Sequence, residues 1–106
     1  IDPCRGLVGI DYEMPVASAQ VKSCLLLAGL YAKGQTVIIE KEASRDHTER
    51  MLTYLGASIV HHNHTITLDP AKKLIGRVIS IPGDISSAAF FIAGASMTEG
   101  AHVLLN

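Results

Sequence analysis

Residues 18–40 read SAQVKSCLLLAGLYAKGQTVIIE and contain the two regular patterns on which the predicted fold is built. Over residues 18–32, apolar side chains recur with helical spacing on one face, and further leucines fill the opposite face. This pattern predicts a helix that is buried on both sides. Lys33 and Gly34 suit the end of that helix, as a cation and as a residue that tolerates a left-handed backbone. The β-branched run at residues 35–40 then predicts a short strand.

Helices and strands alternate on either side of this stretch. Two segments of alternating polarity meet at Asn63 and indicate a β-hairpin. Further strands are predicted at residues 7–12, 57–62, 64–68, 77–81 and 102–105, and further helices at residues 46–55 and 85–97. The chain is therefore predicted to have an α/β (α+β) fold, with the order β-α-β-α-β-β over residues 1–70 and a second β-α-β series over residues 71–106.

Three side chains are typical of helix N-caps. Ser18, Asp46 and Asp84 each precede a predicted helix, and Glu49 lies three residues after Asp46. The spacing of Asp46 and Glu49 resembles a capping box, in which both side chains bond to free backbone N–H groups. We expect Asp84 to be structural, because carboxylate catalysis needs a second titrating group tuned against it.

Several features indicate one piece of a larger repeated structure. Residues 34–39 correspond loosely to residues 100–105, and an apolar helix precedes each of the two segments. Repeated units pack on one another because a single unit does not bury its apolar faces. The chain has 106 residues, 48% of them hydrophobic, and does not begin with Met. We therefore expect residues 1–70 to form one complete repeat unit and residues 71–106 to start the next.

Charge and cysteine content exclude several classes of function. Nine lysine and arginine residues face ten acidic residues, so no basic surface for nucleic acid or an anionic membrane is expected. Residues 88–95, the longest apolar run, are far fewer than the roughly 20 that span a bilayer. The first five residues lack the pattern of a signal peptide. Cys4 and Cys24 are too few for a disulfide framework, which favours a reduced, cytoplasmic setting.

The strand-to-helix loops are the candidate site. Such loops gather at one edge of a parallel β-α-β arrangement, where ligands usually bind. Ser18 and Gln20 lie at a helix N-terminus, where free N–H groups attract anions. Arg45, in the next loop, adds a guanidinium suited to a phosphate or carboxylate. The alternatives are that Ser18 only caps its helix, that Gln20 is solvated, and that Arg45 forms a salt bridge with Asp46 or Glu49.

The histidines indicate no metal site. His61, His62 and His64 cluster at the predicted hairpin, but no cysteine or carboxylate lies nearby at structural-zinc spacing. We expect these three side chains to be solvated. His47, in the first turn of a helix, could titrate near neutral pH, although a surface or capping role is more common.

Three motifs stand in order at the three strand-to-helix loops. They read YEMPVASAQVKS at residues 12–23 with LLLAGL at 25–30, SRDHTERML at 44–52, and PGDISSAAFF at 82–91. In this order and spacing they resemble the 5-enolpyruvylshikimate-3-phosphate (EPSP) synthase family, from about residue 7 to the end of the chain. The Ser-Ala-Gln variant is similar to the bacterial class typified by Gram-positive and glyphosate-tolerant enzymes.

The resemblance implies a reaction and a fold. The family transfers the enolpyruvyl group of phosphoenolpyruvate to the 5-hydroxyl of shikimate 3-phosphate, in the route to aromatic amino acids, without a metal or organic cofactor. Its members have two domains, each built from three β-α-β-α-β-β units. The chain is then expected to be a partial domain of a monomeric, cytoplasmic enzyme, with the remainder of the parent chain as its partner.

The resemblance also implies roles for four residues. Ser18, Ala19 and Arg45 match contacts to shikimate 3-phosphate, and Gln20 matches a residue that touches both substrates. The family's catalytic residues have no counterpart in this sequence, so the segment is expected to be inactive alone. Two alternatives remain: a non-catalytic anion-binding or structural α/β domain, and a fragment of the related UDP-N-acetylglucosamine enolpyruvyl transferase, whose different motif is not found after Pro15.

Overall fold

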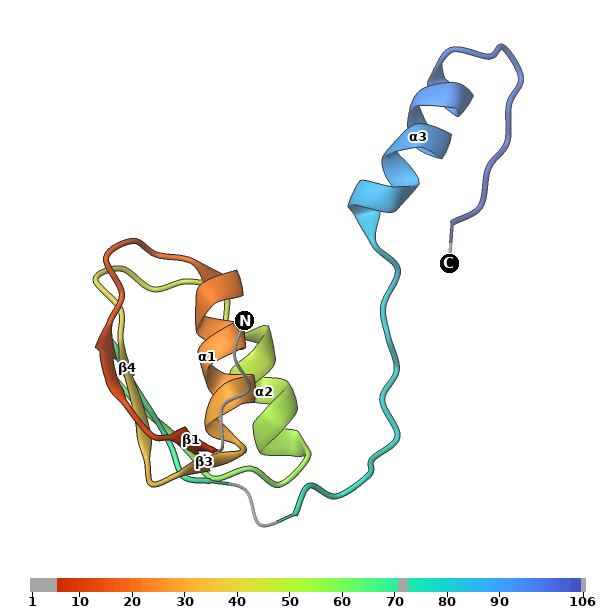
Figure 1. The fold of residues 1–106 in the computed structure, drawn as a ribbon. Coiled ribbons are helices and arrows are strands. Elements are labelled where there is room, and N and C mark those ends of the chain that lie inside the picture. Colours follow the sequence, from red (N-terminus) through yellow and green to blue (C-terminus); the bar gives the residue numbers. More distant parts are fainter. Residues whose placement is uncertain (1–5, 71–72, 106) are drawn as a thin grey trace.

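The computed structural model describes residues 6–70 and 73–105, in which a mixed sheet carries two helices on one face (Figure 1). Cys4 lies outside the described residues. The strands are β1 (Leu7–Val8), β2 (Asp11–Glu13), β3 (Ala32–Lys33), β4 (Thr36–Ile39), β5 (Ile59–His62) and β6 (Thr65–Leu68). The helices are α1 (Ala19–Gly29), α2 (His47–Tyr54) and α3 (Ile85–Ser96).

The main sheet has the strand order β2-β4-β6-β5. β2 and β4 are parallel and are connected through α1, whereas β6 is antiparallel to both of its neighbours. β5 and β6 form the predicted hairpin, with Asn63 in its turn at a φ of 53°. The predicted β-α-β-α-β-β order is thus confirmed over the described part of residues 1–70.

One predicted strand is divided in two, and the first helix, predicted to reach residue 32, ends at Gly29. The strand expected at residues 7–12 is divided into β1 and β2, and a second short strand, β3, precedes β4 and pairs with β1. A Cβ at Gly9 would lie 2.0 Å from the Gln35 carbonyl oxygen, so only glycine allows the two backbones to approach so closely. Gly34 has a φ of 91°, in the left-handed region that glycine favours.

The hydrophobic core lies between the sheet and the two helices. Ile38, Ile66 and Leu68 point from the sheet toward Leu26 of α1 and Leu52 of α2, and all five are essentially inaccessible to solvent. The alternation of buried and less buried residues along β4 and β6 follows from the two-residue period of a strand. On β6, Thr65 and Thr67 lie on the less buried face, whereas Thr36 of β4 is itself buried.

The prediction that the first helix is buried on both sides is wrong. α1 buries one face through Lys22, Leu26 and Gly29, whereas Val21 is 42% and Leu27 47% exposed on the rest of the helix. Within the described residues, the sheet and α2 cover α1 on one side and nothing covers the other. Periodicity identified the helix correctly, but the number of packed faces depends on which elements lie beside it.

Two of the three predicted N-caps are confirmed. The Ser18 hydroxyl accepts a hydrogen bond from the Val21 amide (3.3 Å), and the Asp84 carboxylate accepts one from the Ser86 amide (2.9 Å). Asp46 stands at the N-cap of α2 but makes no side-chain cap hydrogen bond. The capping box is not formed, because the Glu49 side chain is buried against the Lys22 ammonium instead.

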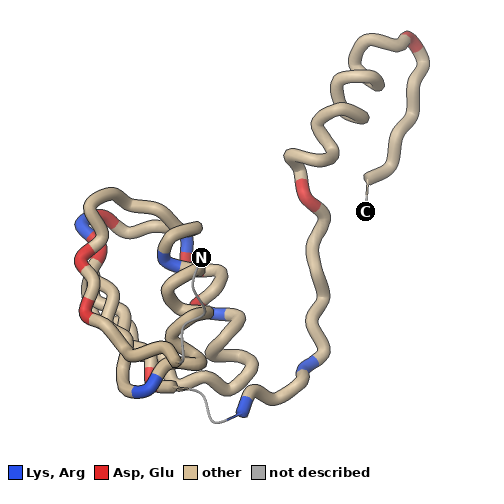
Figure 2. Tube along the Cα trace, in the orientation of Figure 1, with Lys and Arg blue, Asp and Glu red and all other residues tan. Residues whose placement is uncertain are grey.

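Residues 73–105 extend away from the sheet and contain only one regular element, α3 (Figure 1). The strands predicted at residues 77–81 and 102–105 are not formed. A strand needs a neighbouring strand to bond its N–H and C=O groups, and no described strand lies beside either segment. α3 has no buried residue and no charged side chain (Figure 2), and its large apolar side chains Ile85, Phe90, Phe91 and Ile92 are exposed.

Ile38 and Ile39 lie on opposite faces of the sheet, so substitutions at the two positions should change the free energy of unfolding by different amounts. Ile38→Ala removes a fully buried side chain and is expected to reduce the free energy of unfolding by roughly 2–5 kcal/mol. Ile39→Ala, on the opposite face, is the matched control and should cost less than half as much, because Ile39 is 39% exposed. Urea unfolding of both variants measures the difference, and equal losses would contradict the assignment.

Candidate functional site

The parallel pairing of β2 and β4 brings two strand-to-helix loops together. Glu13 and Ile39 are register partners at the carboxyl ends of these strands, and the Met14 amide donates to the Ile39 carbonyl (2.8 Å). From this common edge, the chain continues through Ser18 into α1 and through Asp46 into α2. The side chains of both helix N-terminal regions therefore face the same part of the surface.

A hollow of about 490 Å³ lies at this edge. Ser18, Ala19, Gln20 and Arg45 all line it, so the structure brings the four predicted site residues together. The remaining lining residues are Ala17, Ala43 and Ser44. Ser18 caps α1 as an acceptor, which leaves its hydroxyl proton free to be donated to a ligand in the hollow.

The chemistry of this hollow suits an anion. Arg45 supplies a permanent positive charge on one wall, and the N-terminus of α1 supplies backbone N–H groups on the other. The predicted alternative, a salt bridge from Arg45 to Asp46 or Glu49, is not present, since the ion pairs of the described residues all involve Lys22. The Gln20 side chain adds an amide that can donate and accept hydrogen bonds.

A second hollow of about 440 Å³ adjoins the first and shares Ala19, Gln20 and Arg45 with it. Its other lining residues come from α1 and α2: Ser23, Cys24, Leu27, His47 and Thr48. The Ser23 and Thr48 hydroxyls are hydrogen-bonded at 2.6 Å and join the two helices. The second hollow therefore extends the first along the surface shared by α1 and α2.

A buried charge cluster that sequence reasoning missed lies next to the hollows. The Lys22 ammonium, only 1% exposed, is 3.1 Å from Oε2 of Glu40 and 2.7 Å from Oε1 of Glu49. Oε2 of Glu49 has no hydrogen-bond partner among residues 6–70 and 73–105. The available signal was Lys22, the single charged residue of a helix rich in apolar residues, because a buried ammonium must be paired.

Ionisation in this cluster is stabilised by its own contacts. Burial by itself lowers the pKa of Lys22, but the contacts with Glu49 and Glu40 outweigh burial and raise it. Burial likewise raises the pKa of Glu40, yet the hydrogen bonds from Ser44 and Lys22 outweigh it and hold that pKa below its ordinary value. Both groups are therefore charged across the neutral pH range.

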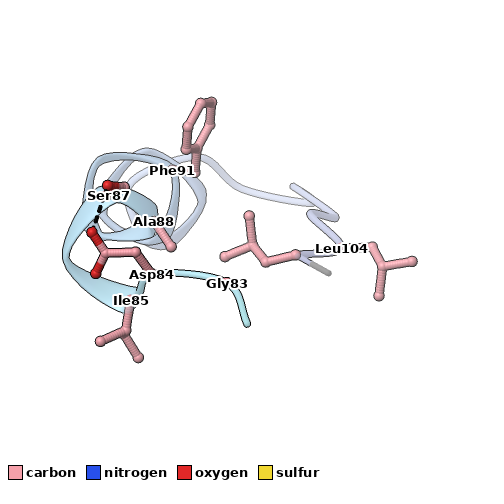
Figure 3. A pocket seen from close by; sticks show the side chains of 8 residues that line it. Gly83, Asp84, Ile85, Ser87, Ala88, Phe91 and Leu104 are labelled. Carbon is pink, nitrogen blue, oxygen red and sulfur yellow. Dashed lines mark hydrogen bonds between the residues drawn. The ribbon is translucent and has the colours of Figure 1, made fainter. Parts of the chain in front are cut away.

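A third hollow, of about 410 Å³, lies beside α3 (Figure 3). Its walls are mainly apolar and include Ile85, Phe91 and Leu104. Asp84 also lines it, but the Ser87 hydroxyl and the Ser86 amide both donate to the Asp84 carboxylate. The hydrogen bond from Ser87 lowers the pKa of Asp84, which keeps the carboxylate ionised as a helix cap. The geometry thus supports the structural role predicted for Asp84.

The described residues contain no group of three histidine, cysteine or acidic side chains that could hold a metal ion. His61 and His62 lie exposed on β5, and His64 follows the turn, away from any carboxylate cluster. None of the helices in the described part of the chain combines the length and hydrophobicity needed to cross a bilayer.

Comparisons with known proteins identify similar sequences and structures. The sequence profile of EPSP synthase (3-phosphoshikimate 1-carboxyvinyltransferase) matches residues 1–106. A 3-phosphoshikimate 1-carboxyvinyltransferase of Alkalilimnicola ehrlichii is 54% identical over 99 residues, which are 93% of this chain and 22% of that protein. One of Leuconostoc citreum is 53% identical over 100 residues, 94% of this chain and 23% of that protein.

The comparison with solved structures also finds an EPSP synthase. A solved EPSP synthase structure from Acinetobacter baumannii superposes with a TM-score of 0.71 at 54% identity, covering 90% of this chain and 21% of that one. The chain therefore spans less than a quarter of the length of the curated relatives that it matches.

The lowered pKa of Glu40 predicts a specific loss of stability in acid. The ionised carboxylate stabilises the folded state fully above its ordinary pKa of 4.5, and this contribution disappears as the pH falls through the lower folded-state pKa. Glu40→Gln should therefore reduce the free energy of unfolding at pH 7 but show a smaller difference from the wild type at about pH 2.5. Urea unfolding at both pH values measures this effect.

Glu42→Gln is the control, because it removes an exposed carboxylate from the same loop. It should change the free energy of unfolding little at either pH. A Glu40→Gln difference that stays constant between the two pH values would contradict the role of Glu40 ionisation.

Proposed function

Because the chain belongs to the EPSP synthase family, we propose that it is part of an enzyme that transfers the enolpyruvyl group of phosphoenolpyruvate to shikimate 3-phosphate. The acceptor is the 5-hydroxyl of shikimate 3-phosphate, and inorganic phosphate is released. The observation that carries this proposal is the convergence of Ser18, Gln20 and Arg45 on one hollow. The family's activity requires the recognition of a sugar-like phosphoester. The hydroxyl, amide and guanidinium groups that line this hollow can form hydrogen bonds with such a ligand.

In the proposed reaction, this chain contributes residues that bind the substrate. The phosphate of shikimate 3-phosphate would accept hydrogen bonds from the Ser18 hydroxyl and the first amides of α1, while Arg45 neutralises its charge. Ala19 leaves room at this point because its side chain is a single methyl group. Gln20 lines both hollows, which supports its proposed contact with both substrates through its amide.

Catalysis needs groups that this chain does not supply. Proton transfer and charge stabilisation at the reacting carbon require titrating or cationic side chains in contact with it. Ser18, Gln20 and Arg45 alone do not form such a set. We assign those roles to the remainder of a longer parent chain, in line with the share of the relatives' length that this chain covers.

The division of the chain follows from the same proposal. Residues 1–70 would form one complete β-α-β-α-β-β unit, and residues 71–106 would begin the next unit of a partial domain in a two-domain enzyme. The segments 77–81 and 102–105 and the exposed helix α3 support this division, since the two segments have strand-like sequences without a described strand to pair with, and α3 has no buried residue. The parent enzyme is proposed to be a monomer in the cytoplasm that binds neither nucleic acid nor membranes.

Removal of the Arg45 guanidinium should weaken substrate use in the full-length enzyme. Arg45→Ala is expected to reduce kcat/KM for shikimate 3-phosphate at least about tenfold, equivalent to about 1.4 kcal/mol of transition-state stabilisation. Gln20→Ala should have an effect of similar size on both substrates. Steady-state kinetics with each substrate varied in turn measures both effects.

Arg50→Ala is the matched control, because Arg50 is exposed on α2 and does not line either hollow at the sheet edge. It should retain wild-type kinetics. Wild-type kinetics in Arg45→Ala and Gln20→Ala would remove the two binding assignments.

The 106-residue chain alone should bind shikimate 3-phosphate without producing EPSP. Isothermal titration tests binding, and a phosphate-release assay with both substrates tests turnover. Turnover by the isolated chain would contradict the proposed division of roles, whereas the absence of binding would favour a purely structural domain.

A further inference from the structure

Glu40 is held between two structural elements that lie on either side of the proposed site. It directly follows β4, and its Oε2 is 3.1 Å from the Lys22 ammonium of α1. Its other oxygen, Oε1, accepts a hydrogen bond from the Ser44 hydroxyl. The Glu40 amide also donates to the His64 carbonyl of the hairpin turn (2.8 Å), which fixes the Glu40 backbone to the sheet.

Ser44 is anchored at two points from inside the molecule. In addition to the bond with Glu40, its carbonyl accepts a hydrogen bond from the Lys22 ammonium at 3.5 Å. Ser44 directly precedes Arg45 and lines the same hollow. The backbone from which the Arg45 side chain projects is therefore tied to α1, the helix whose N-terminus forms the opposite wall.

We propose that Glu40 is a positioning residue, which, held by Lys22, fixes Ser44 and thereby the position of Arg45 relative to the N-terminus of α1. The proposal rests on the proposed function, because it assigns a role to Glu40 in that substrate site. Glu40 itself is 3% exposed and does not line the hollow, so its action passes through Ser44. Loss of the anchor would let the loop move, and small displacements of a binding group are costly.

A purely structural ion pair would contribute to stability without affecting Arg45. The two interpretations differ in the bond to Ser44, which can be removed separately from the charge of Glu40. Glu40→Gln removes the charge but keeps an amide that can donate to the Ser44 hydroxyl while its carbonyl oxygen accepts from Lys22. Glu40→Met is similar in length and removes both. In either variant, Lys22 and Glu49 remain as a balanced pair.

The test is steady-state kinetics of both variants in the full-length enzyme. Glu40→Met is expected to raise KM for shikimate 3-phosphate about tenfold, while kcat and KM for phosphoenolpyruvate change less than about twofold. Glu40→Gln should keep KM for shikimate 3-phosphate within about threefold of the wild type. Equal KM values in the two variants would overturn the proposal, because the bond to Ser44 would then have no effect of its own.

Two further variants separate positioning from stability. Leu68→Val, in the buried core at the far end of β6 from this loop, lowers the melting temperature and should leave KM unchanged. If Glu40→Met does not fold, Glu40→Asp replaces it: the charge remains, but the shorter side chain does not bridge Lys22 and Ser44 together. An unchanged KM in Glu40→Asp would then overturn the proposal.

The outcomes also distinguish this proposal from the proposed function. If the wild-type full-length enzyme does not use shikimate 3-phosphate, the proposed function fails. If it does, and Arg45→Ala raises KM whereas Glu40→Met does not, only the positioning role of Glu40 is refuted.

Discussion

The parallel pairing of β2 with β4 is the constraint on which the candidate site depends. It directs two strand-to-helix connections to one edge of the sheet and thereby places Ser18 and Gln20 opposite Arg45. An antiparallel pairing would have sent these loops to opposite ends, because the carboxyl end of one strand would then lie beside the amino end of the other. The site is in this sense a consequence of strand direction before it is a consequence of particular side chains.

The charge cluster beneath the loops shows how this geometry is stabilised. Two carboxylates and one ammonium are withdrawn from water, which is costly unless each has close partners. Lys22 contacts both Glu40 and Glu49, and Glu40 continues the network to Ser44. An apolar packing of similar volume would bury these positions at lower cost, but it would not bond to a loop backbone. The polar network specifies one arrangement of that loop.

The contrast between the sheet and residues 73–105 shows the limits of local sequence preference. Residues 77–81 have as strong a strand pattern as β4, yet they are extended without pairing, and α3 forms a helix without burying a side chain. Helices satisfy their own hydrogen bonds, whereas strands depend on a neighbour. Within this chain, α3 therefore forms and the two predicted strands do not. The large apolar side chains of α3 and of the two segments remain exposed.

Local patterns in the sequence were sufficient for the β-α-β-α-β-β order, apart from the division of the first strand and the short strand β3. They were also sufficient for the caps Ser18 and Asp84, the hairpin at Asn63, and the motifs containing Ser18, Ala19, Gln20 and Arg45. Each depends on residues a few positions apart, or on a motif that can be recognised directly. The inward turn of Glu49, the exposed face of α1, and the anchoring of Ser44 by Lys22 and Glu40 depended on tertiary structure. Burial and charge pairing are set by residues that are distant in sequence, and only the folded chain brings those residues together.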